Sequence, residues 1–134
     1  MAEDYSLRMP ADLSALLQAE KIQAWAARYG FDWPDVGPVF SKVEEELEEL
    51  KEAYAQGEIS RIEEEVGDLL FAVVNLARHL KVRPETALRA CNRKFVRRFR
   101  HLEKRLKEQG KTLAGTPLIY LEALWEEAKR SGQA

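Results

Sequence analysis

The sequence lacks two features that would point to an exported or strongly charged protein. Its single cysteine, Cys91, cannot form an internal disulfide. A helix-rich chain without paired cysteines is typical of a reducing compartment, so we expect a cytoplasmic protein. Charge of one sign is also missing, because 21 basic residues face 23 acidic ones and leave a formal charge of −2. This balance gives no general attraction to nucleic acid or to anionic membranes, and we expect neither as a partner.

Long hydrophobic runs and strand patterns are absent as well. No apolar stretch approaches the roughly 20 residues of a membrane span, and nothing resembles a signal peptide. No segment alternates apolar and polar residues with the period of a β-strand. There is no glycine-rich phosphate loop, and the serines lie in no nucleophile motif. We therefore expect an all-α protein, and a length of 134 residues favours a single domain over 1–134.

Start and stop signals divide the chain into about five helices. Gly30, Gly57 and Gly110 are suited to end helices, and Pro84 and Pro117 to begin them. The signals predict helices over residues 12–29, 37–56, 59–81, 84–109 and 117–129. The ends of the chain, residues 1–10 and 132–134, are expected to fray.

Two pairs of carboxylates lie at mirror-image positions about Gly57. Glu46 and Glu49 precede it, and Glu65 and Asp68 follow it. Residues three apart share a helix face, so an antiparallel hairpin with its tip at Gly57 brings the four carboxylates together. Converging carboxylates repel one another unless a cation joins them or some are protonated. The pattern predicts a divalent metal site, and all-oxygen ligation suits Mg²⁺, with Mn²⁺ as a possible substitute.

Each of these two helices also carries an apolar stripe, and the acidic pairs lie along its edge. The stripes are expected to form the core; they comprise Val36, Val39, Val43, Leu47, Leu50 and Tyr54 on the earlier helix, and Ile62, Val66, Leu69, Val73 and Leu80 on the later one. Between Val66 and Ala77 the only polar side chains are Asp68 and Asn75. A helix that is apolar nearly all round is normally buried, so we interpret these two as functional polar insertions.

The later helix of the hairpin also indicates an oligomer. Leu70, Phe71 and Val74 lie on an arc away from its main stripe, so one hairpin cannot cover them. A homodimer whose paired hairpins complete a four-helix bundle would bury this arc.

Four segments in this order resemble the MazG nucleoside triphosphate pyrophosphohydrolases, which belong to the all-α pyrophosphatases. They are Phe31-Asp32-Trp33-Pro34, Lys42–Leu50, Glu65–Leu80 and Asn92–Phe99. The resemblance covers roughly residues 13–129. It implies a dimer that hydrolyses a (deoxy)nucleoside triphosphate to the monophosphate and pyrophosphate.

The resemblance also implies roles for individual residues. The metal ligands would be Glu46, Glu49, Glu65 and Asp68, and one of these or Glu45 would accept the proton of the attacking water. The positions implied in nucleotide binding are Lys42, Lys94, Arg97, Arg98 and Trp125. To these we add Asn75, the second polar insertion.

Other interpretations remain open at this stage. The basic face of the fourth predicted helix is also typical of a solvated surface. Lys42 could instead be an ion-pair partner, and Trp125 a core residue. A di-iron site is disfavoured because neither His79 nor His101 lies in Glu-x-x-His spacing. The alternatives for function are a non-catalytic dimeric helical interaction module and a narrow-specificity relative, such as a dUTP/dCTP or phosphoribosyl-ATP pyrophosphohydrolase.

Overall fold

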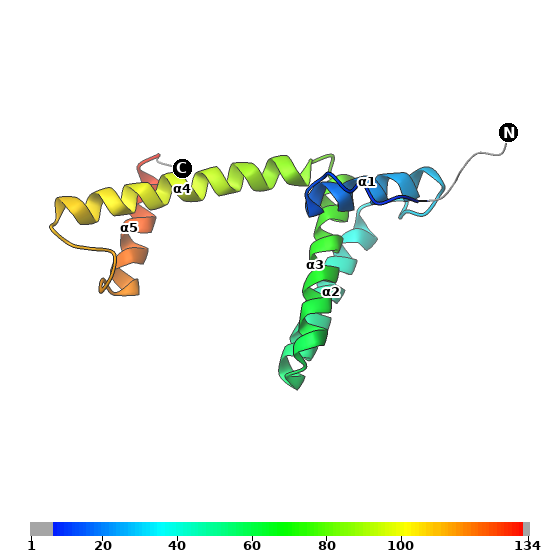
Figure 1. The fold of residues 1–134 in the computed structure, drawn as a ribbon, viewed down its shortest axis with the longest axis horizontal. Coiled ribbons are helices and arrows are strands. Elements are labelled where there is room, and N and C mark those ends of the chain that lie inside the picture. The colour runs from blue at the N-terminus through cyan, green and yellow to red at the C-terminus, as the bar shows by residue number, and fades with distance from the viewer. Residues whose placement is uncertain (1–6, 133–134) are drawn as a thin grey trace. The chain divides into compact units, whose positions relative to one another are not determined.

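The computed structural model describes residues 7–132, in which five α-helices and no strand occur (Figure 1). They are α1 (Ala15–Arg28), α2 (Gly37–Gln56), α3 (Ile59–His79), α4 (Pro84–Glu108) and α5 (Leu118–Arg130). The predicted all-α class is confirmed, and each helix begins and ends within about three residues of its prediction. Of the ends expected to fray, residues 1–6 and 133–134 lie outside the described part of the chain.

None of these helices combines the length and the apolar character that crossing a bilayer requires, over the residues described.

The chain divides into two compact units, and the boundary between them in the sequence follows Glu85. The first unit contains α1, α2, α3 and the start of α4, and the second contains the rest of α4 and α5. That the chain forms a single domain over residues 1–134 stays a prediction.

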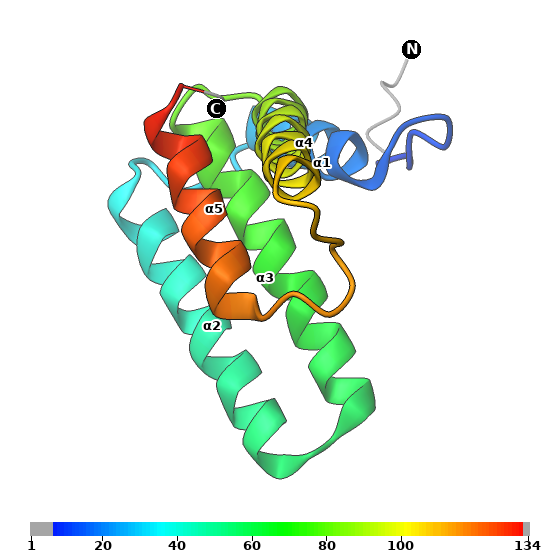
Figure 2. The same ribbon diagram turned by 90° about the vertical axis from the view of Figure 1, so that its left-hand side faces the viewer.

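The first unit is organised around the antiparallel hairpin of α2 and α3, which lie side by side in both views (Figures 1 and 2). Gly57 ends α2 in the left-handed conformation, with φ of 69°, and its N–H donates to the carbonyl of Tyr54 at 3.1 Å. This conformation strains residues that carry a Cβ, so glycine is suited to the position. The predicted tip of the hairpin therefore lies at Gly57.

The acidic edges lie in the seam between α2 and α3, as predicted. The buried side chains are those of Val39, Glu46 and Ala53 on α2, and those of Glu65, Ala72, Val74 and Asn75 on α3. Of the stripes expected to form the core, Val39 is buried, whereas Leu47, Val66 and Val73 remain 40–45% exposed. The stripes are therefore only partly buried within one chain.

Helix α1 packs against α3. Gln23 anchors it, because its Nε2 donates to the carbonyl of Phe71 at 2.9 Å. Val74, one turn further on, is fully buried, while Leu70 and Phe71 stay exposed. The arc of α3 that we expected a second subunit to cover is thus partly buried within one chain.

The connection between α1 and α2 is fastened to the end of α3 by Asp32. Its two carboxylate oxygens accept from Arg78 at 2.8 and 3.1 Å, and Nε2 of His79 lies 2.8 Å from Oδ1. The backbone N–H of Trp33 donates to the same oxygen at 2.9 Å. The Arg78 guanidinium, together with His79 and the Trp33 N–H, lowers the pKa of Asp32 to about 2 despite partial burial.

The second unit has its own small core. Leu102 and Leu106 of α4 pack with Leu124 of α5, and Tyr120 and Leu121 lie against them. Glu127 reinforces the pair, because its Oε1 accepts from Nε of Arg105 at 2.8 Å and lies 3.2 Å from Nε2 of His101.

We predict that Asp32→Asn lowers the free energy of unfolding by about 1–2 kcal/mol at neutral pH. A depressed pKa in the folded state stabilises the fold above the ordinary value of 3.8, and this contribution is lost as the pH falls towards 2. Urea denaturation measures the difference in the free energy of unfolding between wild type and variant. This difference should therefore fall to about half of its pH 6 value at pH 3. An equal gap at both pH values would show that the carboxylate charge is not the cause.

Candidate metal centre

Three glutamates meet in the seam of the hairpin. Glu46 and Glu49 lie on adjacent turns of α2, and Glu65 faces them from α3. Each offers a carboxylate oxygen, and these oxygens lie within 4.8 Å of one another. Glu46 and Glu65 are only 6% and 8% exposed, and Glu49 is half-buried. We call Glu46, Glu49 and Glu65 the acidic trio.

Nearby cationic side chains pair with only some of the carboxylate oxygens of the acidic trio. Lys42 Nζ lies 3.1 Å from Oε1 of Glu46, and Arg61 Nε lies 3.9 Å from Oε1 of Glu65. The second oxygen of each glutamate, Oε2, is buried and has no hydrogen-bond partner within residues 7–132. Buried carboxylate oxygens without partners are costly, so both are available as ligands.

The charges within the trio act on Glu49. The Glu46 carboxylate raises the pKa of Glu49, and burial and the Glu65 carboxylate raise it further. Crowded carboxylates of this kind accept either a proton or a cation. Oxygen-only donors suit a hard divalent ion, so the residues present fit such a metal.

Asp68 does not join the trio, although the sequence predicts it there. It is exposed and borders a cavity of about 300 Å³ together with Lys42, Glu46 and Asn75. Asp68 is therefore not the buried insertion we expected. Glu45 is also exposed, and its Oε2 lies 3.5 Å from Nζ of Lys42.

Asn75 is buried, as expected, and its orientation is defined by Arg78. Its Oδ1 accepts from Nη2 of Arg78 at 2.7 Å and from Nε at 3.2 Å. A guanidinium only donates, so the carbonyl end of the Asn75 amide must face Arg78. The amide nitrogen is then the end left to face the cavity that Asn75 borders.

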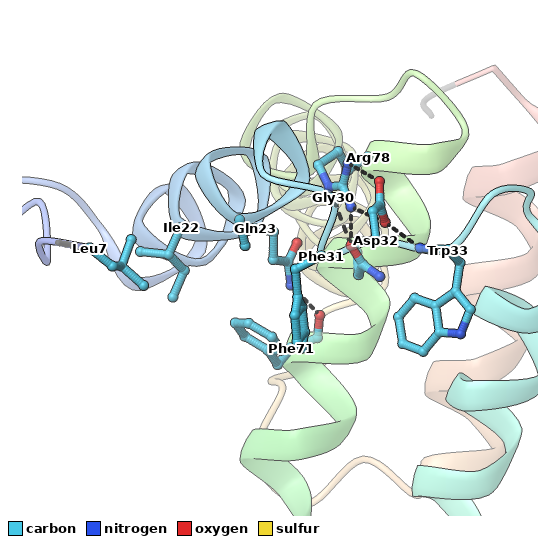
Figure 3. Close-up of a pocket in the computed structure, with 11 residues that line it drawn as sticks. Leu7, Ile22, Gln23, Gly30, Phe31, Asp32, Trp33, Phe71 and Arg78 are labelled. Atoms are coloured by element: carbon cyan, nitrogen blue, oxygen red, sulfur yellow. Dashed lines mark hydrogen bonds and ion pairs between the residues drawn. The ribbon is translucent and has the colours of Figure 1, made fainter. Parts of the chain in front are cut away.

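A second, larger cavity of about 570 Å³ lies between α1, the following loop and α3 (Figure 3). Its lining is mostly apolar, and it shares Trp33, Phe71 and Asn75 with the smaller cavity. Gln23 also borders this cavity and was not among the predicted site residues, and Trp33 was predicted only as part of a motif. The available signal was a lone glutamine between Ile22 and Trp25 on a helix that packs against α3.

The remaining predicted binding residues belong to the second unit. The Arg98 guanidinium carbon lies 5.8 Å from the centre of the Trp125 ring, and the Phe95 ring lies 5.0 Å from it. Nε of Arg98 is buried and lacks a hydrogen-bond partner in the described chain. Lys94 is exposed. Arg97 borders a hollow of about 250 Å³ whose other lining residues are also basic: Arg100, His101 and Lys104.

The sequence of the chain is similar to those of known proteins. Residues 39–103 match the MazG nucleotide pyrophosphohydrolase domain. The chain is 45% identical over 124 residues to the nucleoside triphosphate pyrophosphohydrolase of Escherichia coli K12, covering 91% of this chain and 47% of that protein. It is 50% identical over 115 residues to the nucleoside triphosphate pyrophosphohydrolase/pyrophosphatase MazG of Thermotoga maritima. This match covers 86% of this chain and 44% of that protein.

The chain therefore contains a MazG domain over residues 39–103, and its similarity to these two proteins extends over most of its own length. It spans a little under half the length of the two relatives.

The acidic trio generates a prediction about metal and stability. Because the pKa of Glu49 is raised in the folded protein, its ionised form destabilises the metal-free fold at pH values above its ordinary 4.5. Glu49→Gln should therefore raise the melting temperature of the metal-free protein at pH 7, and this gain should fade below about pH 4.5. Divalent metal at ten times its Kd should stabilise the wild type by about 1.4 kcal/mol and the variant much less.

Glu44→Gln provides the matched control for this melting experiment. Glu44 is an exposed glutamate of α2 outside the trio, so its variant should keep the full response to metal. A wild type whose melting temperature ignores millimolar Mg²⁺ and Mn²⁺ would contradict the metal site.

Proposed function

We propose that the protein hydrolyses nucleoside triphosphates to the monophosphate and pyrophosphate, using Mg²⁺ held by the acidic trio with Asp68 beside it. The observation that carries this proposal is the pair of buried, unpartnered oxygens of Glu46 and Glu65 within a MazG domain. The names of its relatives from Escherichia coli and Thermotoga maritima support the same reaction. The unpaired Cys91 is consistent with our further proposal of a cytoplasmic location.

The proposed reaction needs a nucleophile, a base and compensation for negative charge. Bound Mg²⁺ would supply Lewis-acid polarisation of phosphate oxygens and acidify a water molecule. The oxygen of the attacking water bonds to phosphorus, the bridge between the α- and β-phosphates breaks, and pyrophosphate leaves. The water's proton passes to a carboxylate that faces open space or solvent, for which Asp68 and Glu45 are the candidates.

Cationic side chains would hold the triphosphate during the reaction. Lys42 is placed for this role by its contact with Glu46 at the edge of the smaller cavity. In the second unit we assign the same role to Lys94, Arg97 and Arg98, with Trp125 beside Arg98. Arginine suits bidentate contacts with phosphate oxygens, and these charges stabilise the negative charge that develops as the bond breaks.

We also propose that the protein is a homodimer. Val66, Leu70 and Val73 recur every three or four residues on one face of α3 and, like Leu47 on α2, they are 40–55% exposed. Large exposed aliphatic side chains on adjacent turns are typical of an interface. A second hairpin packed on this face would complete a four-helix bundle around it.

The reaction is tested by incubating the protein with a panel of ribo- and deoxyribonucleoside triphosphates and Mg²⁺, with pyrophosphate resolved from orthophosphate. We expect pyrophosphate, and we expect Glu46→Gln to reduce kcat at least about 100-fold with unchanged helical circular dichroism, because a buried ligand is lost. Glu44→Gln should keep full activity.

Release of orthophosphate from these substrates would contradict the proposed bond cleavage. A complete absence of turnover and of nucleotide binding would favour the non-catalytic interaction module. Turnover of a single nucleotide would place the protein among the narrow-specificity enzymes.

The dimer is tested by sedimentation velocity. Val73→Asp places a charge in the proposed interface and should raise the dimer dissociation constant at least about 100-fold, because a buried unpaired charge is costly. Ile119→Asp on α5 alters an exposed aliphatic residue outside this face and should leave the dimer intact. A wild type that is monomeric at micromolar concentration would contradict the proposal.

A further inference from the structure

Gln23 on α1 has a side-chain amide of which only the nitrogen has a hydrogen-bond partner. It is only 7% exposed, and it borders the larger cavity (Figure 3). Its Nε2 donates to the carbonyl of Phe71 at 2.9 Å. A carbonyl only accepts, so the nitrogen must face Phe71, and Oε1 is thereby fixed as the free end of the amide.

This free oxygen lacks the partner that a buried acceptor requires. Oε1 of Gln23 is buried, and no hydrogen-bond donor reaches it from any described residue. Leaving a buried acceptor unsatisfied is unfavourable, and such groups call for a specific explanation. A ligand with an N–H or O–H donor inside the cavity would satisfy the oxygen.

The walls of the cavity indicate what shape that ligand has. Three aromatic residues contribute to the lining, namely Phe31, Trp33 and Phe71 (Figure 3). All three are exposed in part, and Phe31 is 79% exposed. Exposed aromatic faces are favourable surfaces for a flat heteroaromatic ring. The volume of about 570 Å³ lies within the range of roughly 300–1,000 Å³ that is typical of small-molecule sites.

The cavity also adjoins the smaller one at the acidic site. Trp33, Phe71 and Asn75 line both this cavity and the smaller one that Glu46 and Asp68 border. Asp32 holds the intervening loop to Arg78 by two hydrogen bonds, so this wall is formed before any ligand binds. A molecule with an aromatic ring at one end and phosphates at the other can therefore occupy both cavities.

We propose that the larger cavity binds the nucleobase of the substrate, and that Gln23 is a specificity-determining residue whose Oε1 accepts a hydrogen bond from a ring N–H or amino group of the base. The aromatic side chains cover the ring, and the phosphates extend towards the acidic trio. The choice of a nucleotide as ligand rests on the proposed function. Since every common nucleobase carries an N–H donor, this contact selects for the presence of a base and tolerates several bases.

The experiment compares nucleoside triphosphates with ribose 5-triphosphate, which has the phosphates but no base. Gln23→Met keeps the length of the side chain and removes its acceptor. We expect kcat/KM for the nucleotides to fall about 5- to 30-fold, mainly through KM, and to stay unchanged for ribose 5-triphosphate. Phe31→Ala, a change at an exposed residue that the core does not need, should produce the same selective loss.

Gln18→Met is the matched control. Gln18 lies on the same helix, and its Nε2 also donates to a backbone carbonyl, that of Pro10 at 3.1 Å, but it does not line the cavity. This variant should hydrolyse both kinds of substrate as the wild type does. Equal losses on nucleotides and ribose 5-triphosphate would show that Gln23 acts only on the fold, and no loss at Gln23 or Phe31 would place the base elsewhere.

A binding measurement separates this inference from the proposed reaction. Calorimetric titration of the metal-free protein with nucleoside monophosphate and with ribose 5-phosphate requires no turnover. We expect the wild type to bind the monophosphate at least about 5-fold more tightly, and Gln23→Met to lose this difference. Equal affinities in the wild type would overturn the base site. If no triphosphate were hydrolysed but the wild type still bound the monophosphate more tightly than ribose 5-phosphate, the proposed reaction would be contradicted. The proposed base site would remain supported.

Discussion

Electrostatic repulsion between carboxylates in a helix seam is the constraint on which the rest of this structure depends. Glu46 and Glu65 occupy buried positions that a hairpin normally gives to apolar residues. Lys42 and Arg61 compensate only part of their charge, and the raised pKa of Glu49 reflects the remainder. One oxygen of Glu46 and one of Glu65 remain buried without a hydrogen-bond partner in the described chain, and both are available to a cation.

The same arrangement explains why the hairpin presents an apolar face to its surroundings. Placing the acidic edges in the seam turns Leu47, Val66 and Val73 outward, because residues on one helix cannot all face the same neighbour. The candidate metal site and the proposed dimer interface therefore have one origin. The Asp32–Arg78 ion pair fixes the adjacent loop, whose Trp33 lines both the smaller, acidic cavity and the larger, apolar one.

Much of the fold was predictable from the sequence, and part of its packing was not. Helix boundaries follow local signals such as Gly57 and Pro84, and they were predicted within a few residues. The spacing of the acids about Gly57 predicted that they converge in the seam, and Glu46, Glu49 and Glu65 do so. Asp68 has the same helical spacing but is exposed, and it lies beside Glu46 on the lining of the smaller cavity. How deeply each side chain is buried depends on the packing of the partner helix, which periodicity does not record.

By itself, the sequence determined the helices, the turn at Gly57 and the family, since these depend on local backbone preferences and on the order of motifs. Only the tertiary structure decided which acids are buried without partners, which end of the Gln23 amide is free, and which aromatic residues line a cavity next to the trio. These properties arise from contacts between different helices and loops, such as Glu46 with Glu65, Gln23 with Phe71 and Asp32 with Arg78. Such contacts depend on how the helices pack, and no local pattern in the sequence records that.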